Sequence, residues 1–442
     1  MLAHSDLENR LWINPGEIPD NGIDDDGNGF VDDIHGYDFG DGDGNPDDDS
    51  RNGGHGTHTA GTIVGDGTGG LATGVAPGAK LMVTKVYRTD GGGGSLGSIW
   101  AAQQYCVENG ARVLSMSLVL SGNIPITFLR SERFNAENIR DAGVTFFNSA
   151  GNEFLFAEPP FELGLTARVP SPWNPLPVPH SSTGGVISVG GTTYQADDRY
   201  SLGSRGPAKW DNVDPWHDWA YEPGPGLIKP DIAMPGVYVN STVNTGGYSG
   251  DTWSGTSMSC PHAAGIAALM LEKNPTLSPA GIDSLMQLNA TDLGPPGKDN
   301  EFGAGRVDAF TTVSAVPASP LPDLIWTELR PDPVGDAVLE PGGIETLAVV
   351  LRNNPHGAEA KGVRAYLAVD DNPYVTVVGG EAAFTPLAPG TVADNQGDVF
   401  ELAIAADAPQ GFGITLHLTL VADGGYERTY DKTWYVGLPE WR

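Results

Sequence analysis

The sequence contains little cysteine and no long apolar run, and both absences narrow the class of protein. Its 442 residues include only two cysteines, Cys106 and Cys260, which excludes a disulfide framework. Both lie in helix-like apolar stretches, so two buried free thiols are expected, and a bridge between them is the minority alternative. No apolar stretch approaches the ~20 residues of a membrane-spanning helix, so we expect no membrane partner.

Basic residues are also scarce. The chain has 24 Lys and Arg against 56 Asp and Glu, for a formal net charge of −32. Such a chain repels phosphates, which argues against nucleic acid as a partner. Three explanations of the acidity remain open: calcium-binding loops, a secreted protein kept soluble by its charge, or a salt-adapted surface.

Acidic residues are concentrated before residue 50, where segment 24–33 has the spacing of a calcium loop. Oxygen ligands recur at every second position, and Gly29 allows the sharp turn such loops require. The twelfth position is His35 rather than Glu, so the loop is not an EF-hand. A solvated acidic loop is the alternative to a Ca²⁺ site. The candidate ligands are Asp24, Asp26, Asn28, the carbonyl of Phe30, Asp32 and Asp33.

The segment 254–265 sets a serine in a tight turn of small residues, directly before an apolar stretch. This predicts a buried helix whose first turn presents Ser257, with Pro261 tolerated because first-turn amides have no intrahelical partner. Unpaired N–H groups and the positive end of the helix dipole suit a nucleophile whose reaction develops negative charge. Taken alone, the serine is better explained as an ordinary helix N-cap.

Two other segments change that balance. The first, 53–61, reads GGHGTHTAG, and the second, 149–153, reads SAGNE. The paired histidines are not a zinc site, because the Glu of a HExxH motif is absent. Together with the Ser257 segment they resemble, in the same order, the HGTHxAG, AGN and GTSMxxPHxAG motifs of the subtilisin-like serine proteases (subtilases, peptidase family S8). Further matches extend the resemblance over about residues 1–315, at 227–236, 290–294 and 302–309.

The resemblance implies a serine endopeptidase that works through an acyl-enzyme. Ser257 would be the nucleophile, His55 the general base, and the Asn152 amide with the Ser257 N–H the oxyanion hole. His58 is expected to be a packed structural histidine. The family holds peptides as extended strands, here between 92–95 and Ser117–Leu118, where Val119 replaces the usual glycine. The small residues Ser149, Ala150 and Gly151 would line the primary pocket.

The third member of the triad is not in the sequence. In the family, an aspartate ends an apolar strand shortly before a segment that resembles His4–Leu7. We therefore expect the Asp-bearing strand, the signal and the pro-segment to lie upstream of Met1, and this N-terminally truncated chain to be impaired. Neither Asp6 nor Asp38 is expected to substitute. A catalytically inactive peptide-binding homologue is the alternative.

The order of predicted elements gives the fold class. Short apolar strands near 80–87, 112–118, 144–148 and 185–190 alternate with helix-like segments, which predicts an α/β fold: a subtilisin-like parallel sheet flanked by helices. This peptidase domain would span 1–315. A Pro-rich linker at 316–322 leads to a smaller all-β sandwich at 323–442, which resembles Ig-like accessory domains. We expect a secreted monomer that acts on protein or peptide substrates.

Overall fold

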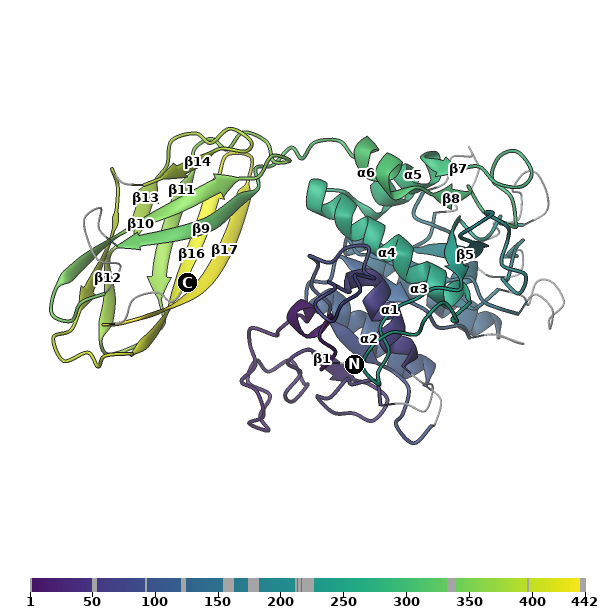
Figure 1. Cartoon of the computed structure of the whole chain (residues 1–442), viewed down its shortest axis with the longest axis horizontal. Helices are drawn as coiled ribbons and strands as arrows, with labels where there is room; N and C mark the ends of the chain where they lie inside the picture. The colour runs from purple at the N-terminus through teal and green to yellow at the C-terminus, as the bar shows by residue number, and fades with distance from the viewer. Residues whose placement is uncertain are drawn as a thin grey trace. The chain divides into compact units, whose positions relative to one another are not determined.

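The computed structural model describes residues 2–49, 54–91, 94–120, 125–153, 163–173, 183–210, 213, 216, 226–331, 339–395 and 397–437. The chain divides into two compact units, each described here by itself (Figure 1). One consists of Met1–Glu272 with Leu277–Val316, and the other of Lys273–Thr276 with Pro317–Arg442.

The first unit is built on a six-stranded sheet in the order β3-β4-β5-β6-β8-β7, parallel except for β7. Every residue of β4 is buried, as expected for a parallel strand covered on both faces. β6 was not predicted, because its proline and glycine weaken the strand pattern. The strands are β3 (Val113–Met116), β4 (Thr145–Ser149), β5 (Val186–Thr193), β6 (Ile232–Val237), β7 (Ala290–Thr291) and β8 (Arg306–Val307).

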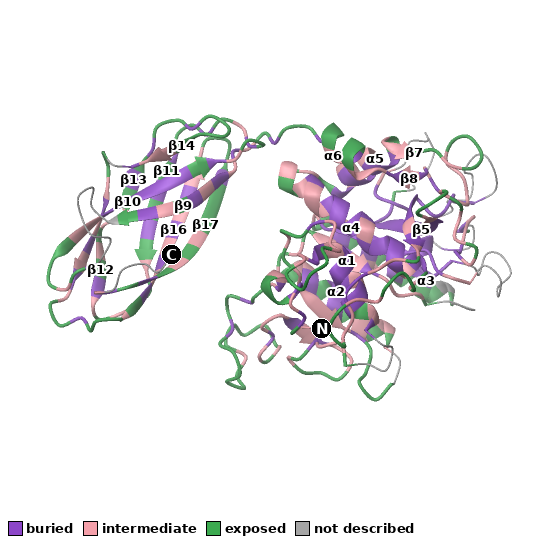
Figure 2. Ribbon diagram, in the orientation of Figure 1, coloured by how far each residue is buried: buried purple, intermediate pink, exposed green. Residues whose placement is uncertain are grey.

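A separate two-stranded parallel sheet pairs β1 (Gly36–Asp38) with β2 (Val83–Lys85). Helices surround both sheets, and Figure 2 shows buried positions along β5 and on α4. The helices are α1 (His55–Val64), α2 (Leu96–Glu108), α3 (Ile126–Asp141), α4 (Thr256–Lys273), α5 (Pro279–Leu288) and α6 (Ala309–Ala315), with 3-10 turns at Glu8–Arg10 and Thr166–Arg168.

Two apolar clusters cover opposite faces of the large sheet. On one face, Phe147 of β4 packs with Cys260 and its neighbours on α4. On the other, Phe146 packs with Cys106 of α2 and Leu129 of α3. Because successive side chains of a strand point to opposite faces, the pair 146–147 contributes to both clusters. Both cysteines are buried and free, which confirms the prediction.

The second unit consists of two antiparallel sheets around one apolar core. One sheet has the order β12-β15-β10-β14 with β9 also paired to β10, and the other has the order β13-β11-β16-β17. The predicted fold class, a parallel α/β sheet followed by a smaller all-β unit, is confirmed. No helix of the described residues is long and apolar enough to cross a membrane. The strands are β9 (Leu324–Pro331), β10 (Ile344–Asn353), β11 (Arg364–Val369), β12 (Val375–Gly379), β13 (Glu381–Ala383), β14 (Val392–Asp394), β15 (Phe400–Ile404), β16 (Gly413–Ala422) and β17 (Tyr426–Tyr435).

Candidate active site

The first turn of α4 presents Ser257, as the sequence predicts. The helix begins at Thr256, whose backbone N–H donates to Asn152 Oδ1 at 3.0 Å. The Ser257 N–H is the next first-turn amide, and no carbonyl of the helix can accept from it. Ser257 is only partly buried, so part of the residue is accessible.

Pro261 lies inside α4, one turn beyond Ser257, so the prediction that it belongs to the first turn was wrong. A proline at this point has no N–H to donate to the carbonyl four residues earlier, which is that of Ser257. That carbonyl instead accepts from the Ser117 hydroxyl at 2.8 Å. The hydrogen bond that the helix lacks at Pro261 is therefore replaced by one that connects Ser257 to Ser117, directly after β3.

The orientation of the Asn152 amide follows from its contacts. Its Oδ1 accepts from the Thr256 N–H at 3.0 Å and from the Thr256 hydroxyl at 3.1 Å. With the oxygen engaged as an acceptor, the Nδ2 group is the part of the amide that can donate to a ligand. Asn152 and Ser257 line the same cavity, so two donors are available there for one developing negative charge.

His55 is the first residue of α1 and lines that cavity too. The chain enters the helix through Gly54, whose φ of 90° is a left-handed conformation that glycine adopts without strain. Burial lowers the pKa of His55 below its ordinary value, and the negative charge of Asp48 opposes this shift. A neutral imidazole at neutral pH can accept a proton. The Ser257 hydroxyl here donates to the Ser117 carbonyl at 3.4 Å.

Asp48 is the carboxylate whose charge acts on His55, and it also stabilises the start of α1. Its Oδ2 accepts from the Thr57 N–H and from the Thr57 hydroxyl, both at 2.9 Å. A carboxylate at a helix N-terminus is favoured by the helix dipole. Asp48 therefore has a structural task of its own, beside its electrostatic effect on His55.

The two other aspartates considered from the sequence are engaged elsewhere. Asp38 pairs with Lys85 at 2.6 Å. Asp6 is buried, accepts from the Tyr248 hydroxyl at 2.7 Å, and also accepts from the Gly69 N–H. These contacts agree with the expectation that neither residue partners His55.

His58 lies one turn further along α1 and is fully buried. Its ring stacks on Trp253 with centroids 4.7 Å apart, and its Nε2 lies 3.2 Å from the Val239 carbonyl oxygen. Burial lowers the pKa of His58 to about 4, so the ring is neutral at physiological pH. This environment is that of a packed structural histidine.

Of the residues predicted to bind substrate, Ser117 and Leu118 line the cavity beside Ser257. Asn148, at the end of β4, fixes this segment by donating to the carbonyls of Met116 at 2.8 Å and Leu118 at 3.0 Å. The opposite edge was predicted at 92–95, and Gly92 and Gly93 lie outside the described residues.

Ser149, Ala150 and Gly151 are buried at the end of β4 and are not among the described residues that line this cavity. The Gly164 N–H donates to the Ala150 carbonyl at 3.2 Å. Val119 lies close to Gly164, since a Cβ added there would come within 2.8 Å of the valine Cγ1. The assignment of these three residues to the primary pocket stays a prediction.

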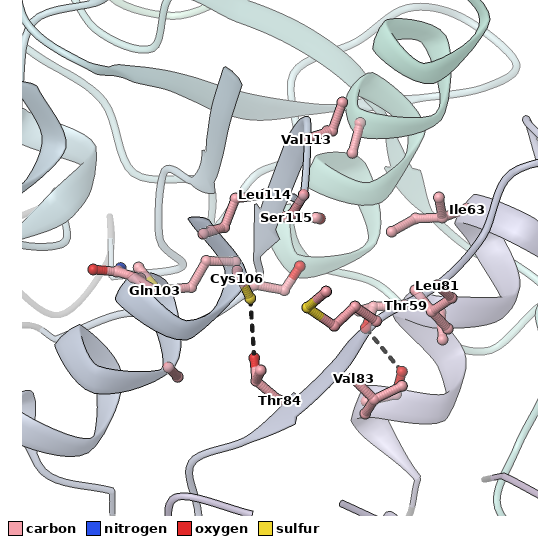
Figure 3. A pocket seen from close by; sticks show the side chains of 18 of the residues that line it. Thr59, Ile63, Leu81, Val83, Thr84, Gln103, Cys106, Val113, Leu114 and Ser115 are labelled. Atoms are coloured by element: carbon pink, nitrogen blue, oxygen red, sulfur yellow. Dashed lines mark hydrogen bonds between the residues drawn. The ribbon is translucent and has the colours of Figure 1, made fainter. Parts of the chain in front are cut away.

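The cavity extends from the Ser257 end into the interior, between β2 and β3, with a volume of about 980 Å³. Figure 3 shows Val83 and Thr84 of β2 on one side of it and Val113 to Ser115 of β3 on another, with residues of α1 and α2 closing the remaining sides. Sequence patterns do not reveal this space, because it depends on how two sheets face each other.

Comparison with known proteins adds to this geometry. The model of the subtilase family, peptidase S8, matches residues 3–305. The chain belongs to the subtilase family. Curated relatives include Subtilisin-like protease 1 of Plasmodium vivax (29% identical, covering 70% of this chain and 45% of the relative), Bacillopeptidase F of Bacillus subtilis strain 168 (32%, covering 63% and 18%) and Fervidolysin of Fervidobacterium pennivorans (28%, covering 75% and 45%).

This subtilase thus spans less than half the length of those three relatives. A solved structure, described as the crystal structure of a cold adapted subtilisin-like serine proteinase, matches 70% of this chain and 85% of its own with a TM-score of 0.45 and 26% identity.

The acidic region before residue 50 brings three carboxylates together. Glu17, Asp24 and Asp26 each offer an oxygen, and these oxygens lie within 4.8 Å of one another. The sequence analysis missed Glu17, because it precedes the acidic run and joins it only when the loop folds back. Its Oε1 accepts from the N–H groups of Asp25 and Asp26 at 2.8 and 3.2 Å, which fixes its position beside the run.

The other predicted ligands of the acidic loop have protein partners. Asp33 is fully buried, and its Oδ2 accepts from the Tyr105 hydroxyl at 2.7 Å. Asp32 accepts from the N–H groups of residues 21 and 22. The Asn28 Oδ1 accepts from the Phe30 N–H at 2.8 Å. These side chains shape the loop around the three-carboxylate cluster.

Proposed function

We propose that this chain is a serine endopeptidase that hydrolyses peptide bonds through an acyl-enzyme at Ser257. The observation that supports it best is that His55, Asn152 and Ser257, from three separate elements, line one cavity. All three are partly exposed, so a substrate can reach them. Family membership and relatives that are named proteases support the same chemistry.

In the proposed reaction, Ser257 Oγ attacks the scissile carbonyl carbon while its proton passes to His55. The carbonyl oxygen becomes an oxyanion, which accepts from Asn152 Nδ2 and the Ser257 N–H. His55 then donates the proton to the leaving amine as the C–N bond breaks. Water, deprotonated by His55, hydrolyses the ester and restores Ser257.

Ser117 contributes at two points in this scheme. Its hydroxyl holds the Ser257 carbonyl at 2.8 Å, and its own carbonyl accepts from Ser257 Oγ at 3.4 Å. For the reaction, the Ser257 hydroxyl turns from this long hydrogen bond to His55. Ser117 and Leu118 both line the cavity, and we propose that an extended peptide substrate aligns along this segment. Proteins or peptides outside the cell are the proposed substrates of a monomeric enzyme.

We also propose a structural Ca²⁺ ion bound by Glu17, Asp24 and Asp26. Three converging carboxylate oxygens form the hard donor set that calcium prefers, and a cation would neutralise their mutual repulsion. The expected result of chelation with EDTA is a lower melting temperature that added Ca²⁺ restores. A Glu17→Gln variant should lose most of this calcium response, and an unchanged melting temperature after chelation contradicts the site.

The activity is tested by labelling Ser257 with a fluorophosphonate in calcium buffer. We expect slow labelling that Ser257→Ala abolishes and His55→Ala reduces further. It should be slow because the Asp48 carboxylate is held by Thr57, and a triad without its carboxylate is about 10⁴-fold less active. If the folded chain labels no faster than Ser257→Ala, the alternative is the inactive peptide-binding homologue. That alternative predicts that the chain binds peptide substrates without cleaving them.

A further inference from the structure

The two histidines at the start of α1 share one aromatic partner. His55 and His58 are three residues apart on a helix, so their side chains lie on the same face. The Trp253 indole stacks on the His58 ring, with 4.7 Å between centroids and 11° between planes. The same indole lies 6.3 Å from the His55 ring, at 36°. Both distances are within the range of about 4.5–7 Å at which aromatic rings attract each other, so Trp253 covers both histidines.

Trp253 belongs to the connection between β6 and α4, and its backbone is fixed there. Its carbonyl accepts from the Val239 N–H at 2.8 Å, and the Gly255 N–H donates to the Gly236 carbonyl at 2.8 Å. Ser257 comes four residues after Trp253, in the first turn of α4. The place of the indole and the place of the nucleophile are therefore set by the same short piece of backbone.

The same connection is bonded to the first turn of α1. The Ser241 hydroxyl donates to the His58 carbonyl at 2.8 Å, and the Thr242 hydroxyl donates to the Thr57 carbonyl at 2.8 Å. The Val239 carbonyl oxygen lies 3.2 Å from His58 Nε2. The connection therefore joins the helix that carries the proposed base to the helix that carries the proposed nucleophile.

His58 can support the indole because its charge stays constant. Its Nε2 faces a carbonyl oxygen and therefore carries a proton. Burial lowers the pKa of His58 to about 4, so the ring carries no second proton at neutral pH. His55, in contrast, gains and loses a proton in the proposed reaction. Trp253 thus lies against one ring that stays neutral and one that changes charge.

Burial has more influence on the His55 ring than the charge beside it. The Asp48 carboxylate, which accepts from the N–H and the hydroxyl of Thr57, acts to raise the pKa of His55. Burial nevertheless lowers that pKa below its ordinary value, and His58 adds no charge because it is neutral. The Trp253 indole supplies part of this burial.

We propose that Trp253 is a positioning residue for the reaction at Ser257. Its indole, supported on His58, sets the tilt and the depth of the His55 imidazole and keeps water from it. Its backbone sets the start of α4, so the base and the nucleophile are held towards each other by one residue. This inference rests on the proposed function, since it explains how His55 is held for the role given to it there.

The first test is a nuclear magnetic resonance titration of the 442-residue chain with labelled histidine, assigned with His55→Gln and His58→Gln. Trp253→Ala should raise the pKa of His55 towards its ordinary value of about 6.5, because water then reaches the ring. Trp253→Phe keeps a ring against His58 and should leave the pKa of His55 close to that of the parent. An unchanged pKa of His55 in Trp253→Ala overturns the proposal.

The second test is the rate at which a fluorophosphonate labels Ser257, measured against reagent concentration. Trp253→Ala should lower the maximal rate about tenfold to 10²-fold, towards that of His55→Ala, because a base displaced by about 1 Å costs this much. The half-saturating concentration should stay the same, and Trp253→Phe should restore most of the rate. A changed half-saturating concentration with an unchanged maximal rate would assign Trp253 to reagent binding and overturn the proposal.

Tyr238→Asn is the matched control. Tyr238 lies in the same connection, its side chain is exposed, and its φ of 57° is one that Asn adopts readily. This variant should leave the pKa of His55 and the labelling rate unchanged, and effects equal to those of Trp253→Ala overturn the proposal. Folding is checked by far-ultraviolet dichroism. If Trp253→Ala does not fold, Trp253→Leu, which stacks on neither ring, takes its place with the same expected directions.

The two tests separate this proposal from the proposed function. If the parent shows no Ser257-dependent labelling, the proposed function fails, and the titration of His55 still decides whether Trp253 positions that ring. If the parent labels at Ser257, and Trp253→Ala labels and titrates as the parent does, the role of Trp253 alone is overturned.

Discussion

Asn152 makes two kinds of hydrogen bond that a single substitution can separate. In the structure its Oδ1 accepts from the N–H and hydroxyl of Thr256, and the proposed mechanism uses its Nδ2 as a donor to the oxyanion. Asn152→Asp keeps an acceptor of the same shape at the start of α4 and removes the donor. Asn152→Ala removes both the acceptor and the donor. Comparing the two variants therefore separates the structural role of Asn152 from its proposed catalytic role.

The magnitudes follow from these contacts. Losing one oxyanion donor costs about 10²–10³-fold in kcat, or about 3–4 kcal/mol of transition-state stabilisation. Folding stability should be maintained in Asn152→Asp, because a carboxylate at a helix N-terminus is worth about 0.3–1 kcal/mol. In Asn152→Ala, the Thr256 N–H loses its acceptor, at about 1 kcal/mol, whereas the Thr256 hydroxyl keeps the Gly151 carbonyl at 3.2 Å. Activity should therefore fall in both variants, and stability in Asn152→Ala alone.

Peptide-anilide hydrolysis measures kcat, and urea unfolding measures the free energy of unfolding. Equal activity of Asn152→Asp and the parent would show that Nδ2 does not stabilise the reaction. Equal destabilisation of both variants would show that Thr256 does not depend on the Asn152 oxygen. A Thr256→Val variant, which removes only the hydroxyl, serves as the control for the structural contact.

Three further predictions concern charge and hydrogen bonding elsewhere in the first unit. Lys229→Met should lower the free energy of unfolding by about 3 kcal/mol in urea titrations, the low end for a broken buried pair, because Asp231 loses its nearest partner but still pairs with Lys298 at 3.1 Å; a change below 1 kcal/mol contradicts this. Burial lowers the pKa of His55, and its neutral form, present above that pKa, is the base, so the acid limb of kcat/KM should lie below pH ~6.5; a limb above that value refutes the assignment. Ser117→Ala should cost about 1 kcal/mol of stability through the orphaned Ser257 carbonyl, and an unchanged melting curve would show that this bond is not maintained in solution.

Local sequence pattern predicted the fold class and the places of the candidate site residues on it. Ser257 at a helix start and Asn152 after a buried strand were predictable because each belongs to a short motif with its own backbone logic. Contacts between segments that are distant in the sequence were not predictable in this way. Glu17 comes close to Asp24 only when the loop folds back. The Ser257 carbonyl, which cannot bond to Pro261, accepts from the Ser117 hydroxyl only because β3 and α4 lie side by side.

The cavity between β2 and β3 and the candidate catalytic residues are connected through the same sheet edge. Ser117 follows directly from β3, so the strand whose open edge faces the cavity also holds the Ser257 carbonyl. His55 begins α1, whose next turn, with Thr59 and Ile63, forms a wall of the cavity. The cavity and the candidate site therefore share two elements, β3 and α1, so a substitution that repacks the cavity wall should also change the reactivity of Ser257.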